Sequence, residues 1–250
     1  MKDSEYRSWA DLPSDLTSSI LIRLGVIDIL ENAQKVCRSW RRVCKDPSMW
    51  RKIDMGNLIP KIIYCKCDDL GIMCRHAVDR SQGGLVEIDI KYFCTDKLLN
   101  YIAHSSSNLR SLRLVECYTI KNDGFVDAVV KHPLLEYLEV THLPLTGESL
   151  KIAGQSCPNL KTLKLNGSTW KRILINGFDN NALAIAESMP KLRHLELLGN
   201  SLTNTGLNAI LDSCPHLEHL DIGMCFNIQF DEDLKKRCST RIRVVKGPAI

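Results

Sequence analysis

Six segments from residue 85 onward repeat one order of apolar and polar positions. Each reads apolar-x-x-apolar-x-apolar, and the segments are LVEIDI at 85, LRSLRL at 109, LEYLEV at 135, LKTLKL at 160, LRHLEL at 192 and LEHLDI at 217. Their starts lie 24, 26, 25, 32 and 25 residues apart. Apolar and polar side chains that alternate in this way favour short strands with one buried face. The regular spacing therefore predicts a stack of similar units.

A helix-capping residue and an apolar helical stretch follow each predicted strand. The capping residues have side chains that accept hydrogen bonds at helix starts, and they are Thr95, Asn122, Thr146, Asp179, Thr203 and Asp231. Pro158, Pro190 and Pro215 lie in the turns that lead to the next strand. We therefore predict an α/β chain in which residues 85–246 form a short curved solenoid with a parallel sheet on its concave face.

The repeats resemble the cysteine-containing subtype of leucine-rich repeats. That subtype has one Cys three residues after the last strand leucine and another before the closing Pro. Cys117 and Cys225 match the first place, and Cys157 and Cys214 match the second. Because no pair of cysteines recurs from repeat to repeat as a ligand set would, we expect these thiols to be small buried apolar groups.

The side chains between the strand leucines point to the concave face. Their central positions carry mostly alternating charges, so we expect many of them to pair across strands that lie about 4.8 Å apart. The same face is the candidate surface for a protein substrate, which is compatible with such pairing. The candidate residues are Asp89, Arg113, Tyr137, Glu139, Lys164, His194, Glu196, His219 and Asp221.

Residues 9–53 have a different pattern, which predicts three short helices. Leu16, Ile20, Leu21 and Leu24 lie near one face of the first helix. The last helix has an apolar arc and, opposite to it, a cationic arc. The apolar residues are Val36, Cys37, Trp40, Val43 and Cys44, and the cationic residues are Arg38, Arg41, Arg42 and Lys45. So few residues do not easily build an independent core, and their apolar surface needs the solenoid or another protein to pack against.

The order of residues in this segment resembles an F-box. The matching residues are Leu12-Pro13, Ile20-Leu21, Leu24, Val26, Ile29-Leu30, Val36-Cys37-Arg38-x-Trp40-Arg41, Pro47 and Trp50. Ser14 and Asp15 stand where Glu often follows the Leu-Pro pair. With the repeats and the linking stretch IMCRHAVDRSQGGLVEIDI, nearly the whole chain resembles plant F-box/leucine-rich-repeat proteins, which are substrate receptors of Skp–cullin–F-box ubiquitin ligases.

The resemblance implies a non-catalytic adaptor with three parts: an F-box at 9–53, a linker and N-terminal cover of the solenoid at 54–84, and about six repeats at 85–246. The F-box would bind a Skp-type subunit and through it a cullin, and the repeats would bind a protein substrate without a cofactor. By carry-over from the family, the adaptor-facing or F-box core residues are Leu12, Pro13, Ile20, Leu21, Leu24, Leu30, Val36 and Trp40. The sequence does not divide contact residues from core residues. The alternative is a leucine-rich-repeat scaffold whose F-box-like helices only cap the solenoid.

Composition and charge exclude several other classes. The net charge of +4, from 33 basic and 29 acidic residues, lacks the concentrated basic footprint of a nucleic-acid-binding protein. No run of 18 apolar residues predicts a membrane span, and the polar N-terminus has no signal-peptide core. We therefore expect a soluble protein of the nucleus, the cytoplasm or both, with its eleven cysteines reduced.

Metal and catalytic sites also receive little support from the sequence. Cys65, Cys67, Cys74 and His76 are four potential zinc ligands, but the first two have C-x-C spacing, which suits a structural zinc site poorly. We find no G-x-S-x-G, no H-E-x-x-H and no phosphate-binding glycine loop. We therefore predict no metal, no catalytic residue and no enzyme activity of the chain itself.

Overall fold

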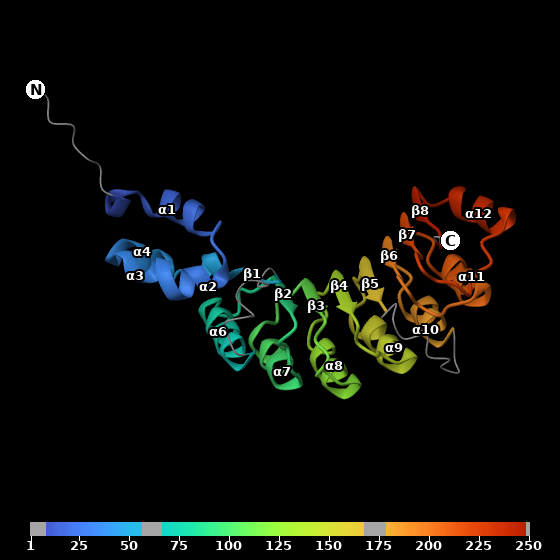
Figure 1. The fold of residues 1–250 in the computed structure, drawn as a ribbon, viewed down its shortest axis with the longest axis horizontal. Helices are drawn as coiled ribbons and strands as arrows, with labels where there is room; N and C mark the ends of the chain where they lie inside the picture. Colours follow the sequence, from blue (N-terminus) through green and yellow to red (C-terminus); the bar gives the residue numbers. More distant parts are fainter. Residues whose placement is uncertain (1–8, 57–66, 168–178, 249–250) are drawn as a thin grey trace, which may run out of the picture.

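The computed structural model describes residues 9–56, 67–167 and 179–248, and in it the chain forms an arc (Figure 1). The described strands make one parallel sheet in sequence order: β1 (Lys52–Met55), β2 (Glu87–Lys91), β3 (Ser111–Val115), β4 (Tyr137–Thr141), β5 (Thr162–Asn166), β6 (His194–Glu196), β7 (His219–Asp221) and β8 (Val244–Lys246). The sheet lines the concave side of the arc, as predicted. Two of these strands, β1 and β8, were not among the six predicted.

Helices return the chain along the convex side of the arc (Figure 1). They are α6 (Cys67–Arg80), α7 (Asp96–Ser105), α8 (Asn122–Val129), α9 (Gly147–Ser156), α10 (Asn180–Ser188), α11 (Asn204–Ser213) and α12 (Glu232–Ser239). Among the described residues, no helix is both long and apolar enough to cross a bilayer. The strand leucines and the inner helix faces together form one continuous buried core.

Polar side chains near the helix starts join successive repeats. Thr95, Thr146, Thr203 and Asp231 cap their helices, as predicted. The cap prediction is wrong for Asn122 and Asp179, whose side chains do not cap α8 and α10. Asn122 Oδ1 instead accepts a bond from the Thr146 N–H of the next repeat at 3.0 Å, and Asp179 Oδ1 accepts one from the Thr203 N–H at 2.8 Å. These two side chains therefore stabilise the stack of repeats rather than single helices.

The repeat cysteines are buried, and their thiols bond to the preceding repeat. Cys225 Sγ donates to the Leu197 carbonyl at 2.8 Å, and Cys157 Sγ donates to the His132 carbonyl at 3.5 Å. Burial raises the pKa of Cys157 to about 12 and the pKa of Cys225 to about 11, so neither thiol forms a thiolate near neutral pH. This confirms the prediction that these two cysteines are packing residues.

The N-terminal segment consists of three helical rods and two short 3-10 turns. The elements are η1 (Trp9–Asp11), α1 (Ser14–Leu21), a rod made of α2 (Val26–Asp28), η2 (Ile29–Ala33) and α3 (Gln34–Val36), then α4 (Arg38–Val43) and η3 (Pro47–Trp50). The predicted amphipathic helix through 36–44 is interrupted at Cys37, which has φ −156° and ψ 174°. The Cys37 thiol accepts a bond from the Trp40 N–H at 3.4 Å. Val36 consequently faces solvent, and only Val43 and Cys44 of the predicted apolar arc are fully buried.

This segment runs directly into the solenoid. The predicted boundary at residue 53 falls inside β1, which pairs with β2 in the same register as the later strands. Ile53 and Met55 point into the core, and the buried Trp50 donates from Nε1 to the Cys44 carbonyl at 2.9 Å. Helix α6 packs beside β1 at this end of the solenoid. The N-terminal helices and the repeats thus share one core.

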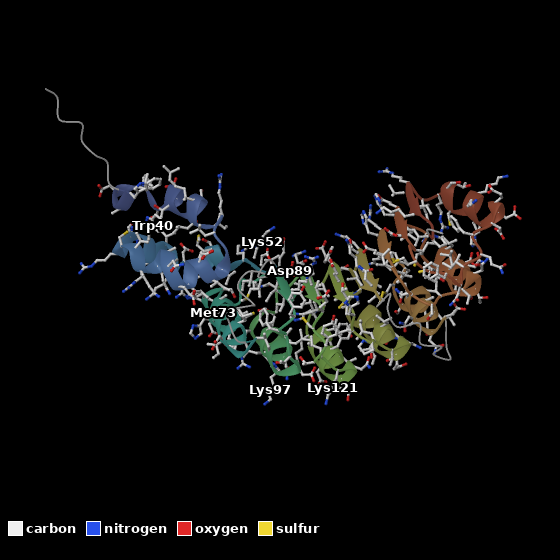
Figure 2. The ribbon with its side chains drawn as sticks, in the orientation of Figure 1. Trp40, Lys52, Met73, Asp89, Lys97 and Lys121 are labelled. Atoms are coloured by element: carbon white, nitrogen blue, oxygen red, sulfur yellow. The ribbon has the colours of Figure 1, made fainter. Side chains whose placement is uncertain are left out.

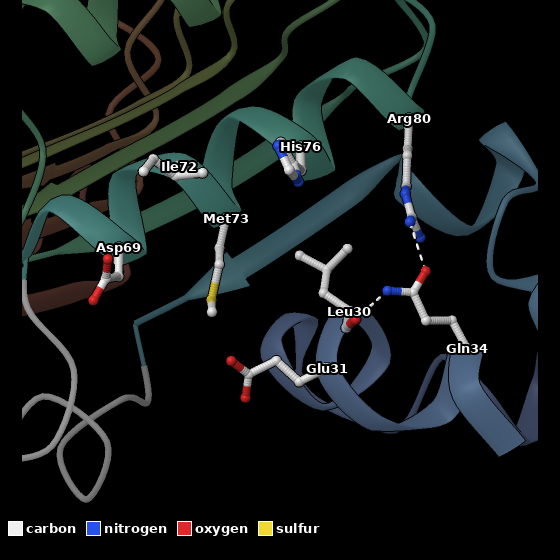
Figure 3. A pocket seen from close by; sticks show the side chains of 8 residues that line it. All are labelled: Leu30, Glu31, Gln34, Asp69, Ile72, Met73, His76 and Arg80. Atoms are coloured by element: carbon white, nitrogen blue, oxygen red, sulfur yellow. Dashed lines mark hydrogen bonds between the residues drawn. The ribbon is translucent and has the colours of Figure 1, made fainter.

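Arg80, at the end of α6, connects these two parts (Figure 3). Its guanidinium donates from Nη1 to the Cys44 carbonyl at 3.0 Å and from Nη2 to Gln34 Oε1 at 2.7 Å. The same group lies over the Trp50 ring, 5.3 Å from the ring centroid. Hydrogen bonds from a charged donor contribute about 1.5–3 kcal/mol each when both partners are partly buried. Arg80 therefore fixes the direction in which the N-terminal helices leave the solenoid.

We expect Arg80→Ala to loosen the N-terminal helices from the solenoid at a cost of about 2–3 kcal/mol, because two hydrogen bonds to other elements are lost. Hydrogen exchange of the amides in α2 to α3 should accelerate. Arg75→Ala is the matched control, since Arg75 on the same helix contacts the Tyr101 ring within the solenoid. Equal exchange rates in α2 to α3 for both variants would contradict this role of Arg80.

One turn between helix and strand contains a buried imidazole. Three residues before the first leucine of the repeat segments that begin at 109, 135, 160, 192 and 217, the chain places a fully or nearly fully buried side chain, and these are Ser106, His132, Cys157, Met189 and Cys214. In the described residues, neither ring nitrogen of His132 has a hydrogen-bond partner of normal geometry. Burial and the nearby charge of Lys131 lower the pKa of His132 to about 4. The ring is therefore neutral at pH 7.

The stability of the fold should consequently fall on acidification. In the unfolded chain His132 takes up a proton near pH 6.5, whereas in the folded chain it stays neutral down to about pH 4. The folded state therefore keeps its full stability above about pH 6.5 and loses stability as the pH falls towards 4. The loss is at most about 3 kcal/mol. His132→Cys installs the residue found at the same place in two other repeats, and its urea-unfolding free energy should fall less between pH 7 and pH 5 than that of the wild type. Parallel losses in the two proteins would show that His132 does not titrate in this way.

Candidate functional site: two protein-binding surfaces

The first candidate surface is a group of exposed apolar side chains on the N-terminal segment. We call it the N-terminal apolar surface, and it consists of Trp9, Leu16, Ile20, Ile22, Leu24 and Val36. Leu16 and Ile20 lie one turn apart on α1 and are 50% and 41% exposed. Helix α1 packs on α4 at the end of the arc, away from the sheet (Figure 1). No described part of the solenoid covers these side chains.

The structure divides the predicted adaptor-facing residues into exposed and buried positions. Pro13, Ile20, Leu24 and Val36 are exposed, and Leu12 and Trp40 are half-buried. Leu21 and Leu30 belong to the core, with exposed fractions of 0% and 8%. As the helices stand, these two leucines are buried and act in packing.

Sequence reasoning did not include Trp9, Leu16 and Ile22 among the adaptor-facing residues, although all three are at least half exposed. The spacing of Leu16 and Ile20 was the available signal. Exposure itself depends on which side of α1 meets α4, and a tertiary contact sets this: Arg42 Nη2 on α4 donates to Ser14 Oγ on α1 at 3.2 Å.

Trp40 on α4 lies in the N-terminal segment and packs against the core (Figure 2). Its ring is half-buried against core residues, and its Nε1–H is covered without a hydrogen-bond partner in the described residues. A covered indole N–H without a partner is costly. Trp40, which the sequence predicted to be an adaptor-facing or F-box core residue, therefore packs partly against the core.

The second candidate surface is the concave face of the sheet. Its central positions form a ladder of cross-strand ion pairs, as predicted. Arg113 lies between Asp89, at 2.6 Å, and Glu139, at 3.0 Å. Lys164 pairs with Glu196 at 3.1 Å, and the two atoms come from adjacent strands in register. The last pair is Asp221 with Lys246 of the unpredicted strand β8, at 3.0 Å.

Electrostatics hold Arg113 and Tyr137 in place within this ladder. Burial alone would lower the pKa of Arg113, but its bonds to Asp89 and Glu139 raise it above the usual value. Burial and the hydrogen bond from Tyr137 Oη to Glu139 Oε2, at 2.5 Å, raise the pKa of Tyr137. Glu139 is itself 6% exposed. The charged groups of this half of the face are thus engaged with one another, although Asp89 Oδ1 and Arg113 Nε are buried without a hydrogen bond of normal geometry in the described residues, and Glu139 is recessed.

The predicted histidines of the concave face meet each other. His194 on β6 and His219 on β7 are paired in register, and their rings stack with centroids 4.4 Å apart and planes 15° from parallel. Burial and the neighbouring His219 lower the pKa of His194, so its ring is neutral at pH 7. Together with Lys164, Glu196, Asp221 and Lys246, the two rings line a shallow cleft of about 190 Å³.

The possible zinc ligands receive no support from the described residues. Cys65 lies outside them, as does the side chain of Cys67. Cys74 is fully buried, and burial raises its pKa to about 12, which disfavours the thiolate that a metal needs. His76 is exposed on α6. No three His, Cys, Asp or Glu side chains of the described ranges come together as a metal site would require.

A larger cleft of about 400 Å³ separates the N-terminal rod from α6 (Figure 3). Leu30 and Met73 face it from the two sides, and Arg80 closes one end through its bond to Gln34. Glu31 on the rod also borders it. This cleft belongs to the junction of the two parts rather than to either candidate surface.

Comparisons with known proteins agree with this division. A family model described as F-box-like matches residues 9–56. The match covers the N-terminal helices and ends one residue after β1. The F-box predicted from the sequence is therefore confirmed.

Relatives from Arabidopsis thaliana match nearly the whole chain. F-box/LRR-repeat protein 23 is 62% identical over 99% of this chain, which spans only 55% of that relative's length. F-box protein SKIP19 is 61% identical, with 99% of this chain and 80% of the relative covered. F-box/LRR-repeat protein 9 is 53% identical, with 94% and 95% covered. Identity at this level over both the helices and the solenoid shows that the chain belongs to the plant F-box/leucine-rich-repeat family.

Proposed function

We propose that this chain is a substrate-recognition subunit of a Skp–cullin–F-box ubiquitin ligase, with the F-box binding a Skp-type subunit and the repeats binding a protein substrate. The observation that carries the proposal is the N-terminal apolar surface, which the solenoid leaves uncovered. Ubiquitin transfer would then be the work of other subunits, and this chain would need no catalytic residue.

The size of the exposed apolar group supports a protein partner. Of the 14 large apolar side chains exposed in the described residues, six belong to the N-terminal apolar surface. Burying a side chain such as Leu16 or Ile20 fully is worth about 1.5–3 kcal/mol. A soluble chain rarely leaves several such groups together unless another protein covers them. A partner with an apolar groove would therefore gain most of its affinity from α1 and the turn after it.

The alternative function is a scaffold whose F-box only caps the solenoid, and it explains the buried side of the F-box but not the exposed apolar side chains. Trp50, Ile53 and Met55 do close the open end of the sheet, as capping requires. Capping gives no reason for the exposed apolar side chains of α1, however, because the described part of the solenoid does not cover them. Capping and partner binding would thus use different residues of the same segment.

A rigid junction suits an adaptor. The N-terminal helices stand at one end of the arc, and the concave face opens beside them (Figure 1). β1, Trp50 and Arg80 link the two parts through strand pairing, core packing and hydrogen bonds. A substrate on the concave face would therefore be held at a fixed distance from the partner on α1.

We expect Leu16→Asp/Ile20→Asp to abolish copurification with a plant Skp-type subunit, since two charges would enter an apolar interface. Affinity, measured by isothermal titration calorimetry, should fall at least about 100-fold, which is roughly 2.7 kcal/mol. Leu183→Asp is the matched control, because Leu183 is a 47%-exposed leucine on α10, remote from the F-box. Its affinity should equal that of the wild type.

Circular dichroism separates lost binding from lost folding, because both substituted residues are exposed and the variant should keep its helical signal. The proposal fails if the wild-type chain shows no association with the Skp-type subunit at micromolar concentration. It also fails if the α1 variant binds as well as the Leu183 variant does.

A further inference from the structure

The ion pairs of the concave face expose their two partners unequally. In the pair of Lys246 with Asp221, the lysine side chain is 69% exposed and the aspartate 19%. In the pair of Arg193 with Glu218, the values are 53% and 31%. Long cationic side chains reach past the shorter carboxylates, which lie closer to the sheet. The charges nearly balance in number, but a partner that approaches this face meets cations first.

The half of the face formed by β5 to β8 also has free hydrogen-bonding groups. The cleft there is open, and its floor is the stacked pair of His194 and His219. Both rings are only partly buried, and the structure gives their nitrogens no hydrogen-bond partner among the described residues. A neutral imidazole has one donor and one acceptor nitrogen, and it becomes a double donor when protonated. The pair can therefore donate to carboxylates.

The other half of the face, over β2 to β4, has fewer free hydrogen-bonding groups. Arg113 already contacts two carboxylates, and the Tyr137 hydroxyl already donates to Glu139. A ligand there would have to break these contacts before it formed its own. Hydrogen-bond donors without a partner among the described residues, next to exposed cationic side chains, are thus concentrated over β5 to β8.

We propose that the concave surface over β5 to β8, centred on the stacked rings of His194 and His219, docks an acidic segment of the substrate protein that is rich in Asp and Glu. This inference rests on the proposed function, since it names the class of substrate that the repeats take. Arg193, Lys164 and Lys246 would contact the carboxylates from the sides, and the two imidazoles would contact them from below.

The experiment uses the full chain in complex with a plant Skp-type subunit and three fluorescein-labelled peptides of about ten residues, a length that extends across the four strands. One peptide is rich in Asp and Glu, one is rich in Lys, and one is a neutral Ser/Gly peptide. Fluorescence anisotropy should show binding of the acidic peptide only, weakening as ionic strength rises because the contacts are solvent-exposed.

Arg193→Gln/Lys246→Gln should weaken binding of the acidic peptide about tenfold by removing two of the outward cations. The matched control is Lys97→Gln/Lys121→Gln, which removes the same charge from the convex side (Figure 2) and should leave the affinity unchanged. Equal losses in both variants would show an unspecific effect of net charge and would overturn the proposal.

Protonation of His194 gives an independent readout. Burial lowers the pKa of His194, so its imidazolium forms only below the usual range, and the affinity for the acidic peptide should rise severalfold from about pH 7 to about pH 5.5 because an imidazolium ion attracts carboxylates. The charged or titratable groups that face the pair are Lys164, Arg193, Glu196, Glu218, Asp221 and Lys246. The carboxyl groups among them and in the peptide titrate mainly below this range. His194→Gln/His219→Gln should therefore flatten the dependence.

Each outcome decides between the two proposals. If the Skp-type subunit copurifies and the acidic peptide does not bind, or the Lys-rich peptide binds as well, the acidic docking site is wrong and the adaptor function stands. If the Skp-type subunit does not copurify, the adaptor function fails, and the same peptides titrated into the chain alone then test whether the face is selective for acidic segments.

Discussion

The whole molecule depends on closing the ends of a stack of parallel strands. Each repeat buries its leucines only against its neighbours, so the first and last repeats would expose an apolar edge to water. At the C-terminal end, β8 and α12 provide the cover, with Leu234 and Cys238 buried. At the N-terminal end the F-box provides it, through Trp50, β1 and α6. The fold thereby joins the F-box and the repeats in one core.

One segment both closes the sheet and exposes apolar side chains, so the orientation of those side chains relative to the repeats is fixed. The inward side of the F-box is fixed by the shared core and by Arg80. Its outward side, on α1, has no contact with the solenoid that would satisfy it. An F-box joined by a flexible linker could bind the same partner, but it would not hold the concave face at a defined place relative to it.

The sequence predicted the repeats well because their signal is local. Leucines at fixed spacing define both the strand and its buried face. The same pattern is present in WRKIDM at residue 50, which was assigned to the F-box and therefore not counted as a repeat strand. The pattern is incomplete in IRVVKG at 242, where Gly247 stands in place of the last leucine. Asn122 and Asp179 look like helix caps in one dimension, and only the neighbouring repeat shows what they bond. The same limit applies to Leu21 and Leu30, whose burial is set by helix packing.

On the concave face, the alternation of charges was readable, and the pairing followed from strand register. The sequence did not predict that the cations would be more exposed than the carboxylates, because this difference depends on how far each side chain extends from the sheet. The stack of His194 on His219 likewise required the exact register of β6 and β7. In the ion pairs of this face, the cationic side chains are therefore more exposed than the carboxylates.

The most direct test of the central claim is calorimetric titration of the purified chain with a plant Skp-type subunit at several temperatures. If α1 is the binding surface, the two proteins should form a one-to-one complex of micromolar or tighter affinity with a negative heat-capacity change, the signature of apolar surface leaving water. Absence of binding, or binding without a heat-capacity change, would contradict it, because the apolar side chains of α1 would then remain exposed.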